Sequence, residues 1–105
     1  MPFFDQLERD IHFKKHGAEF GASDPADYER MADAFMFGAI ESDARECVRP
    51  QGEDRIRFGF ITHRLGVACV TPQFIRTFHV VRLRTVRSHR DSAGYFAWQC
   101  GRIYT

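Results

Sequence analysis

The stretch Arg55-Ile-Arg-Phe-Gly-Phe60 decides the fold, because its residue types alternate along the chain. The arginines and Gly59 fall on one set of alternate positions, and Ile56, Phe58 and Phe60 fall on the other. Successive side chains of a β-strand point to opposite faces of the sheet. The stretch is therefore predicted to be a strand with one solvated face and one packed face.

Three further strands are predicted on either side of this stretch, from apolar runs with turn signals at their ends. They are Glu46–Arg49, Val67–Thr71 and Phe74–Arg84, with turns at 50–52 and 63–66. Each turn is short, which favours antiparallel neighbours. These strands are expected to form one antiparallel meander.

A first helix is predicted from Phe4 to His16, with an apolar stripe of Phe4, Leu7 and Ile11 that we expect to face the core. Gly17 follows as a natural C-terminal stop.

A second helix begins after Asp24, which can cap it, at Pro25, which suits the first helical position. Its apolar residues follow helical spacing, at Tyr28, Met31, Ala32, Phe35 and Ala39. A last helix or turn is predicted over Ala93–Cys100.

Helices that precede the strands in sequence predict an α+β fold with both helices packed on the sheet. A chain of 105 residues is expected to be a single domain, residues 1–105.

Charge is distributed unevenly along the chain. Residues 1–54 carry 13 acidic and 6 basic side chains, whereas residues 55–105 carry nine arginines, no lysine and one acid, Asp91. Arginine suits bidentate contact with phosphate, so a polyanionic partner is expected for the second half. The alternative is that the acidic helices neutralise an arginine-rich sheet within the domain.

Cysteine spacing suggests neither a zinc ribbon nor a disulfide framework. Cys47, Cys69 and Cys100 are odd in number, widely spaced and without a C-x-x-C pair. We expect buried free thiols in a reducing compartment.

No apolar run approaches the roughly 18–20 residues that span a bilayer. The opening Met1-Pro-Phe-Phe-Asp5 has neither a basic region nor a signal-peptide core. We therefore expect no membrane partner and action in the cytoplasm, that of a target cell where the domain is delivered into one.

The segment His12-Phe-Lys-Lys-His-Gly-Ala-Glu-Phe-Gly21 concentrates chemistry-bearing residues. In a helix, His12 and His16 lie one turn apart, with Glu8 on the preceding turn and Lys15 beside them. Histidine titrates near neutral pH, so such a pair can hold one proton and accept another. The same spacing also suits a solvated helix face or part of a zinc site.

The residues in this order resemble a group of bacterial toxin and phage-associated RNase domains, the barnase, EndoU, colicin-RNase and RelE group. The stretches that carry the resemblance are His12–Gly21, Tyr28–Phe35, Val48–Asp54, Arg57–Phe58 and Ile75–Phe78. The resemblance implies helices packed over a four-stranded antiparallel sheet and a metal-independent ribonuclease without a cofactor. It also implies a tight, acidic immunity protein as partner beside the RNA substrate, with tRNA as one candidate.

Carried over by position, the resemblance implies catalytic roles for His12, His16, Arg57, Arg76 and Thr77, and a substrate contact for Thr62. The charge pattern adds Lys15, Arg82, Arg84 and Arg87 as substrate-binding residues.

RNA cleavage without a metal needs a base for the 2′-hydroxyl, an acid for the leaving oxygen and a fixed cation on the phosphate. We expect His16 to be base or acid with His12 as its partner, and Arg57 and Arg76 to grip the phosphate. The prediction requires all four side chains to share one cleft.

Two other functions stay open from the sequence. One is a binding module that holds RNA or an acidic protein without cleaving it. The other is a zinc-dependent hydrolase built on His12 and His16, with a further ligand from Glu19, His63, His79 or His89.

Overall fold

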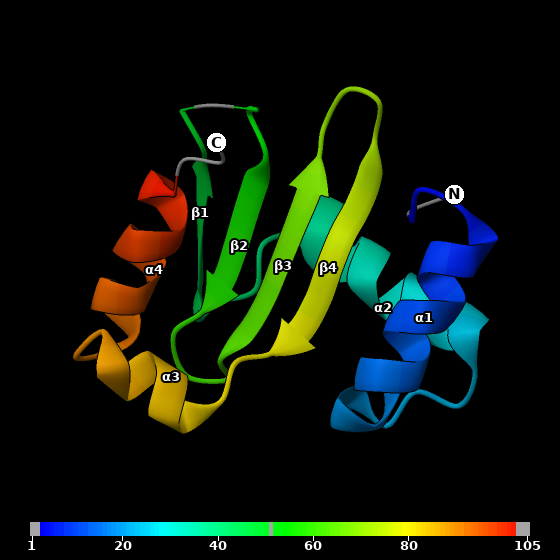
Figure 1. Ribbon diagram of the computed structural model, residues 1–105, viewed down its shortest axis with the longest axis horizontal. Coiled ribbons are helices and arrows are strands. Elements are labelled where there is room, and N and C mark those ends of the chain that lie inside the picture. The colour runs from blue at the N-terminus through cyan, green and yellow to red at the C-terminus, as the bar shows by residue number, and fades with distance from the viewer. Residues whose placement is uncertain (1–2, 51, 103–105) are drawn as a thin grey trace.

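The computed structural model describes residues 3–50 and 52–102. The strands are β1 (Ala44–Val48), β2 (Arg55–Gly59), β3 (Arg64–Cys69) and β4 (Phe74–Val80), and the helices are α1 (Gln6–His16), η1 (Gly17–Phe20), α2 (Pro25–Phe37), α3 (Leu83–Ser88) and α4 (Ser92–Gly101). Figure 1 shows α1 beside the β4 edge, α2 behind the sheet, and α3 and α4 toward the β1 edge. The predicted α+β class, with N-terminal helices and a four-stranded antiparallel sheet, is confirmed. Within the described residues, no helix combines the length and the apolar character needed to cross a membrane.

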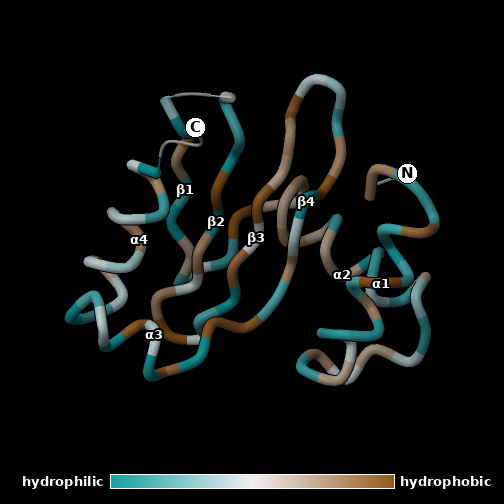
Figure 2. The backbone as a smooth tube through the Cα atoms, in the orientation of Figure 1, coloured by the Kyte–Doolittle hydropathy of each residue, from teal (hydrophilic) through white to brown (hydrophobic). Residues whose placement is uncertain are grey.

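The sheet is an antiparallel meander in the order β1-β2-β3-β4. Directly opposed residues share a face, so the pairs Arg57–Gly66 and Gly66–Phe78 define one face of the sheet. We call this the rear face, because α2 covers it, and the opposite one the front face. The alternation in β2 that predicted a strand is visible in Figure 2 as successive brown and teal segments.

The rear face carries an aromatic core. Phe35 and Met36 of α2 are buried against Phe78 and Ala68 of the sheet. A side chain at position 66 would collide with Met36, so Gly66 lets the helix approach the strands closely. The buried hydroxyl of Tyr28 donates a hydrogen bond to the carbonyl of Phe78, which fixes α2 against β4.

Two helices, α3 and α4, cover part of the front face. Over β2 and β3, Tyr95 of α4 and Val86 of α3 pack on Phe58, Leu65 and Val67. Beside β4 lies α1, which contacts the strand edge rather than covering the sheet.

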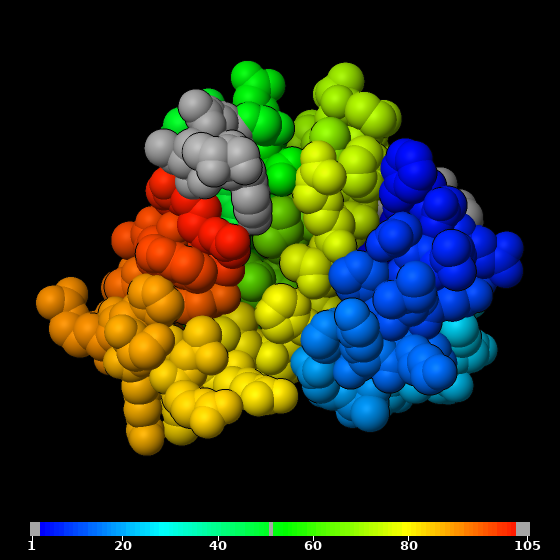
Figure 3. All heavy atoms as spheres, in the orientation of Figure 1, coloured from blue at the N-terminus to red at the C-terminus, as the bar shows by residue number. Residues whose placement is uncertain are grey.

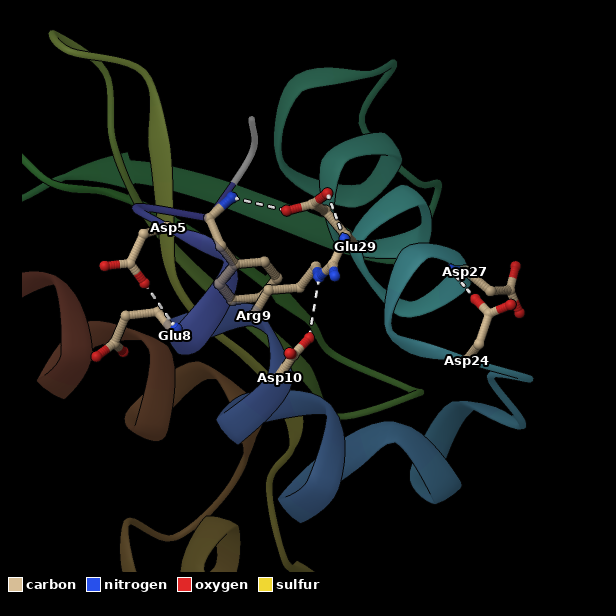
Figure 4. Close-up of polar contacts among 8 residues, drawn as sticks. Asp5, Glu8, Arg9, Asp10, Asp24, Asp27 and Glu29 are labelled. Atoms are coloured by element: carbon tan, nitrogen blue, oxygen red, sulfur yellow. Dashed lines mark hydrogen bonds and ion pairs between the residues drawn. The ribbon is translucent and has the colours of Figure 1, made fainter.

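Acidic caps begin both N-terminal helices, as Figure 4 shows. The Asp5 carboxylate accepts a hydrogen bond from the Glu8 N–H at 2.8 Å, and that of Asp24 accepts one from the Asp27 N–H at 2.7 Å. Such caps satisfy the unpaired N–H groups of a first helical turn. The predicted start of the second helix at Asp24 and Pro25 is confirmed.

The predicted orientation of the first helix is wrong. Its apolar stripe is exposed, with Phe4 68%, Leu7 67% and Ile11 40% accessible, instead of facing the core. Because α1 lies at the sheet edge, it has no sheet face to cover. The core contacts come instead from Phe13 of the helix and from Phe3, which precedes it.

The predicted fourth strand is too long. Strand β4 ends at Val80, and the chain turns into α3 at Leu83. The Val81 N–H still donates to the His63 carbonyl, but the partner strand β3 begins only at Arg64, so the ladder has no partner to continue along. Beyond Val80 the sequence alternates apolar residues and arginines, a pattern that is typical of a strand and led to the longer prediction. The predicted last helix over 93–100 is confirmed as α4.

The prediction of three free thiols is wrong for two of them. Cys47 of β1 and Cys100 of α4 form a disulfide, and Cys69 is the free cysteine. The two partners are 53 residues apart in sequence and meet because α4 packs back on the first two strands. The same region is tied by Arg49, which is 1% exposed and donates from Nε to the Gln99 carbonyl at 2.9 Å.

Candidate active site

Three histidines from two elements meet where α1 lies against β4. The ring centroids of His16 and His79 are 5.0 Å apart and stacked, and those of His12 and His16 are 6.3 Å apart. His12 and His16 follow each other by one turn of α1, and His79 projects from the front face of β4 opposite Leu65. We call these three residues the histidine cluster.

Glu19 fixes one member of the cluster. Its Oε2 lies 2.7 Å from Nδ1 of His16, and its Oε1 accepts the Val80 N–H at 2.7 Å. One carboxylate therefore joins η1 to the end of β4 and orients the His16 ring. Because a carboxylate accepts, Nδ1 carries a proton and Nε2 is the nitrogen left for chemistry.

A β-bulge lies in β4 at Arg76 and Thr77, just before His79. Val67 pairs with Thr77 and Ala68 pairs with Ile75, so Arg76 is the extra residue. The Thr77 hydroxyl is 3.1 Å from Nδ1 of His79. Nε of Arg76 donates to Oδ1 of Asp54 at 3.0 Å, and its side chain stays 47% exposed.

Burial favours the neutral imidazole at two members of the cluster, His79 and His12. Burial lowers the pKa of His79 below the ordinary 6.5, with His16 adding to this effect and Glu19 opposing it. Burial also lowers the pKa of His12, where Glu8 opposes the shift and His16 and Lys15 add to it. Both rings are therefore uncharged at pH 7 and able to accept a proton.

Arg57 does not join the histidines. It lies on the rear face, where its Nη1 donates to the carbonyls of Phe35 at 3.0 Å and Gly38 at 2.7 Å. Its Nε donates to Glu46 at 2.7 Å, and its side chain is 10% exposed. These contacts satisfy C-terminal carbonyls of α2, and the burial of the side chain leaves little of the guanidinium open to a phosphate. The single cleft required by the sequence hypothesis therefore excludes Arg57, and the guanidinium of Arg76 is paired with Asp54.

Thr62 also has a structural task. Its N–H and hydroxyl donate to the Asp43 carboxylate at 3.0 and 3.1 Å, which closes the turn between β2 and β3. Burial alone would raise the pKa of Asp43, but these hydrogen bonds and that from Ile61 outweigh it and lower the pKa.

The basic residues expected to bind substrate are exposed. Lys15 lies on α1 close enough to influence His12. Arg82, Arg84 and Arg87 lie on or beside α3, which follows directly from the end of β4. Within the described residues none of these three arginines has a carboxylate partner, so their charge is available to a polyanion.

Two residues of the site were not predicted in their observed roles. His79 was considered only as a zinc ligand, although it lies two residues after Thr77 and so on the same face of a strand. Glu19 lies three residues after His16, a spacing that joins side chains across a helical turn. The spacing of Thr77 and His79 can be recognised from the sequence once the strand is assigned. The contact of Glu19 with Val80 cannot, because it depends on where β4 ends.

Among residues 3–50 and 52–102, no group of three or more His, Cys, Asp or Glu side chains is arranged to hold a metal ion. No protein-family model matches the chain, and no curated protein matches it. The geometry of the cluster and the sequence resemblance are therefore the grounds for a functional proposal.

Proposed function

We propose that the chain is a metal-independent endoribonuclease that works through the histidine cluster. The observation that carries the proposal is the stacked pair His16–His79, 5.0 Å apart, with Glu19 holding one ring at 2.7 Å. Two imidazoles from different elements, one of them oriented by a carboxylate, are suited to act as acid and base on one substrate.

In this mechanism the 2′-hydroxyl of RNA attacks the adjacent phosphorus. His79, neutral because burial lowers its pKa, accepts the hydroxyl proton at a ring nitrogen. The O2′–P bond forms and the P–O5′ bond breaks, while His16, acting as an imidazolium whose Nδ1–H is held by Glu19, gives its Nε2 proton to the leaving 5′-oxygen and is left neutral. The products are a 2′,3′-cyclic phosphate and a free 5′-hydroxyl. His12, stacked on Phe3 at 5.4 Å and next to His16, supports the pair.

Charge on the phosphate oxygens is met by Arg76 and the Thr77 hydroxyl. Asp54 lies between two arginines, 3.0 Å from Arg76 and 3.9 Å from Arg49, so one carboxylate does not neutralise both. The arginines of α3 extend the positive surface along the path that a strand of RNA would follow.

The class of toxin, and an acidic immunity protein as inhibitor, rest on the sequence resemblance. Such an inhibitor would complement the exposed arginines of α3 and approach by electrostatic steering.

The test is cleavage of a single-stranded RNA in the presence of EDTA by the wild type and by His16→Ala and His79→Ala. Each substitution is expected to lower the rate about 10²–10⁴-fold, the usual contribution of an acid–base group. His89→Gln is the matched control, because His89 packs on Trp98 at 4.5 Å, away from the cluster. Its rate should equal that of the wild type.

Other outcomes separate the alternatives. Salt-sensitive RNA binding without cleavage would identify a binding module instead. Activity that EDTA abolishes and zinc restores would identify a metal-dependent hydrolase. Cleavage by His16→Ala or His79→Ala at the wild-type rate would overturn the proposed mechanism.

A further inference from the structure

A cavity of about 340 Å³ lies between the start of α1 and β4. Its walls are Phe4, which precedes α1, Glu8 from the first turn of that helix, and Phe74, Ile75 and Arg76 from β4. Glu8 connects it to the cluster, because its Oε2 is 3.7 Å from Nε2 of His12. We propose that this cavity binds a nucleobase that flanks the cleaved phosphodiester and selects bases with an amino group over uracil.

The apolar walls suit a flat aromatic ligand. The rings of Phe4 and Phe74 are 5.5 Å apart and steeply inclined, at 70°. The guanidinium of Arg76 lies 5.0 Å from the centroid of Phe74. Phe4 is 68% exposed, so a large apolar ring faces water next to a cation. Aromatic rings and arginine planes are the surfaces on which unpaired bases stack.

The carboxylate distinguishes a base from other occupants. A site for phosphate alone would not include Glu8, whose negative charge repels an anion. A site for an apolar side chain of a protein would use neither Glu8 nor Arg76. A nucleotide uses both charges, because Arg76 can contact its phosphate while Glu8 accepts hydrogen bonds from the edge of its base.

The same carboxylate sets the selectivity. Ionised, Glu8 can only accept hydrogen bonds. Adenine, cytosine and guanine each present an amino group as donor. In uracil the single N–H lies between two carbonyl oxygens, which a carboxylate repels. Uracil should therefore be the least favoured occupant.

The distance along the helix places this base next to, rather than at, the cleaved bond. Glu8 precedes His16 by two turns of α1, about 12 Å at the usual rise. That the bound base flanks the cleaved bond rests on the proposed function. That the cavity binds a base does not depend on it.

The test uses DNA oligonucleotides with a single ribonucleotide, so that only one linkage can be cleaved, and with the flanking bases varied among A, C, G and U. The wild type should cleave strands with flanking U about tenfold more slowly than the best of the others, as expected for one lost hydrogen bond to a charged acceptor. Glu8→Gln, whose amide can also donate, should remove this discrimination. If Glu8 acted only through its electrostatic influence on His12, the substitution would change the cleavage rates for all four flanking bases by the same factor.

Phe4→Ala should weaken binding of every strand about tenfold, the usual cost of one lost stacking ring. Leu7→Ala is the matched control, because Leu7 is similarly exposed on α1, at 67%, and does not line the cavity. Affinity is measured by fluorescence anisotropy on labelled all-deoxy strands, which cannot be cleaved by 2′-hydroxyl attack.

The two proposals fail in different ways. Cleavage by the wild type with equal rates for all flanking bases, and with Phe4→Ala behaving as Leu7→Ala, would overturn the base site and leave the ribonuclease. Absence of cleavage, together with base-dependent binding that Phe4→Ala and Glu8→Gln reduce, would overturn the ribonuclease and leave the base site. Binding unaffected by both substitutions overturns the base site whether or not RNA is cleaved.

Discussion

The front face of the sheet has two halves that are built in opposite ways. Over β1 and β2, α4 closes the face with the Cys47–Cys100 disulfide, the Arg49–Gln99 hydrogen bonds and the packing of Tyr95 on Phe58. Beside β4, α1 meets the strand through imidazoles and carboxylates and leaves a cavity. Figure 3 shows the yellow residues of β4 open to view between the orange and red α4 and the blue α1.

The two halves of the front face differ in what their contacts do. The closed half consists of contacts that lower the free energy of the folded state. The open half holds partly buried titratable side chains whose neutral form is favoured, and an exposed aromatic pair. Perturbed titratable groups next to a cavity are typical of functional sites. The predictions below compare the two halves, and the two faces, in order of expected effect.

The largest effect is expected from the closed half. Replacing Cys47 and Cys100 by serine releases a loop of 53 residues, which should lower the free energy of unfolding by about 4 kcal/mol on the loop-entropy scale. Urea denaturation measures this. RNA cleavage by the folded fraction should persist, because the disulfide does not touch the histidine cluster. The control Cys69→Ser should change stability little. A double variant as stable as the wild type would contradict this division between the halves.

The two arginines assigned to the phosphate from sequence should behave differently. Arg57→Ala removes a buried cation bonded to Glu46 and two helix carbonyls, and should cost about 3 kcal/mol of unfolding free energy. Arg76→Ala removes a half-exposed side chain and should cost less than about 1 kcal/mol, yet lower RNA cleavage about 10²-fold.

Denaturant titration and cleavage assays on both variants measure these effects. A greater loss of stability in Arg76→Ala, or a greater loss of cleavage per folded molecule in Arg57→Ala, would reverse the assignment of the two faces.

These arginines also show how far the sequence could predict the site. The alternation of β2 correctly separates Arg57 from Ile56 and Phe58, but the predicted solvated face is wrong, because α2 covers it and buries Arg57. In the Ile75–Phe78 motif, Thr77 lies next to the strand histidine His79, whereas Arg76 pairs with Asp54. Alternation alone does not tell which polar face receives α2. The C-terminal carbonyls of α2 happen to lie over Arg57, a tertiary contact that no local pattern encodes.

The apolar stripe of α1 is the opposite case, because apolar side chains that were expected to be buried are exposed. Helical spacing of Phe4, Leu7 and Ile11 predicts a buried face because most such stripes cover a core. The helix ends at His16 as predicted but begins at Gln6, so Leu7 and Ile11 of the stripe lie on it and Phe4 precedes it. The environment of the stripe depends on whether the helix lies over a sheet or at an edge, which only the packing of α2 decides.

Acid should weaken the open half. For His12 and His79 the pKa is lower in the folded than in the unfolded protein, so between these values the unfolded chain binds more protons. Stability is then fully present above pH 6.5, the ordinary value, and declines as the pH falls toward the folded pKa.

Thermal unfolding from pH 7.5 to 5 measures this slope, and the double variant His12→Gln/His79→Gln should flatten it. An unchanged slope in the double variant would show that these histidines are not responsible.

The smallest effect is expected on the outer surface of α1. Leu7→Gln should change the free energy of unfolding by less than about 0.5 kcal/mol, because the side chain is exposed and makes no core contact. The matched substitution Phe13→Gln, in a residue packed against the rear core, should cost several times more. Equal losses in the two variants would mean that the stripe is covered in solution.

The most direct test of the account follows the imidazole signals of all five histidines by NMR while an all-deoxy oligonucleotide is added. The account predicts that His16 and His79 shift together and saturate at one concentration, with His12 following, while His63 and His89 stay unchanged. Shifts confined to His63 or His89, or binding that leaves the His16 and His79 signals in place, would show that nucleic acid does not bind between α1 and β4.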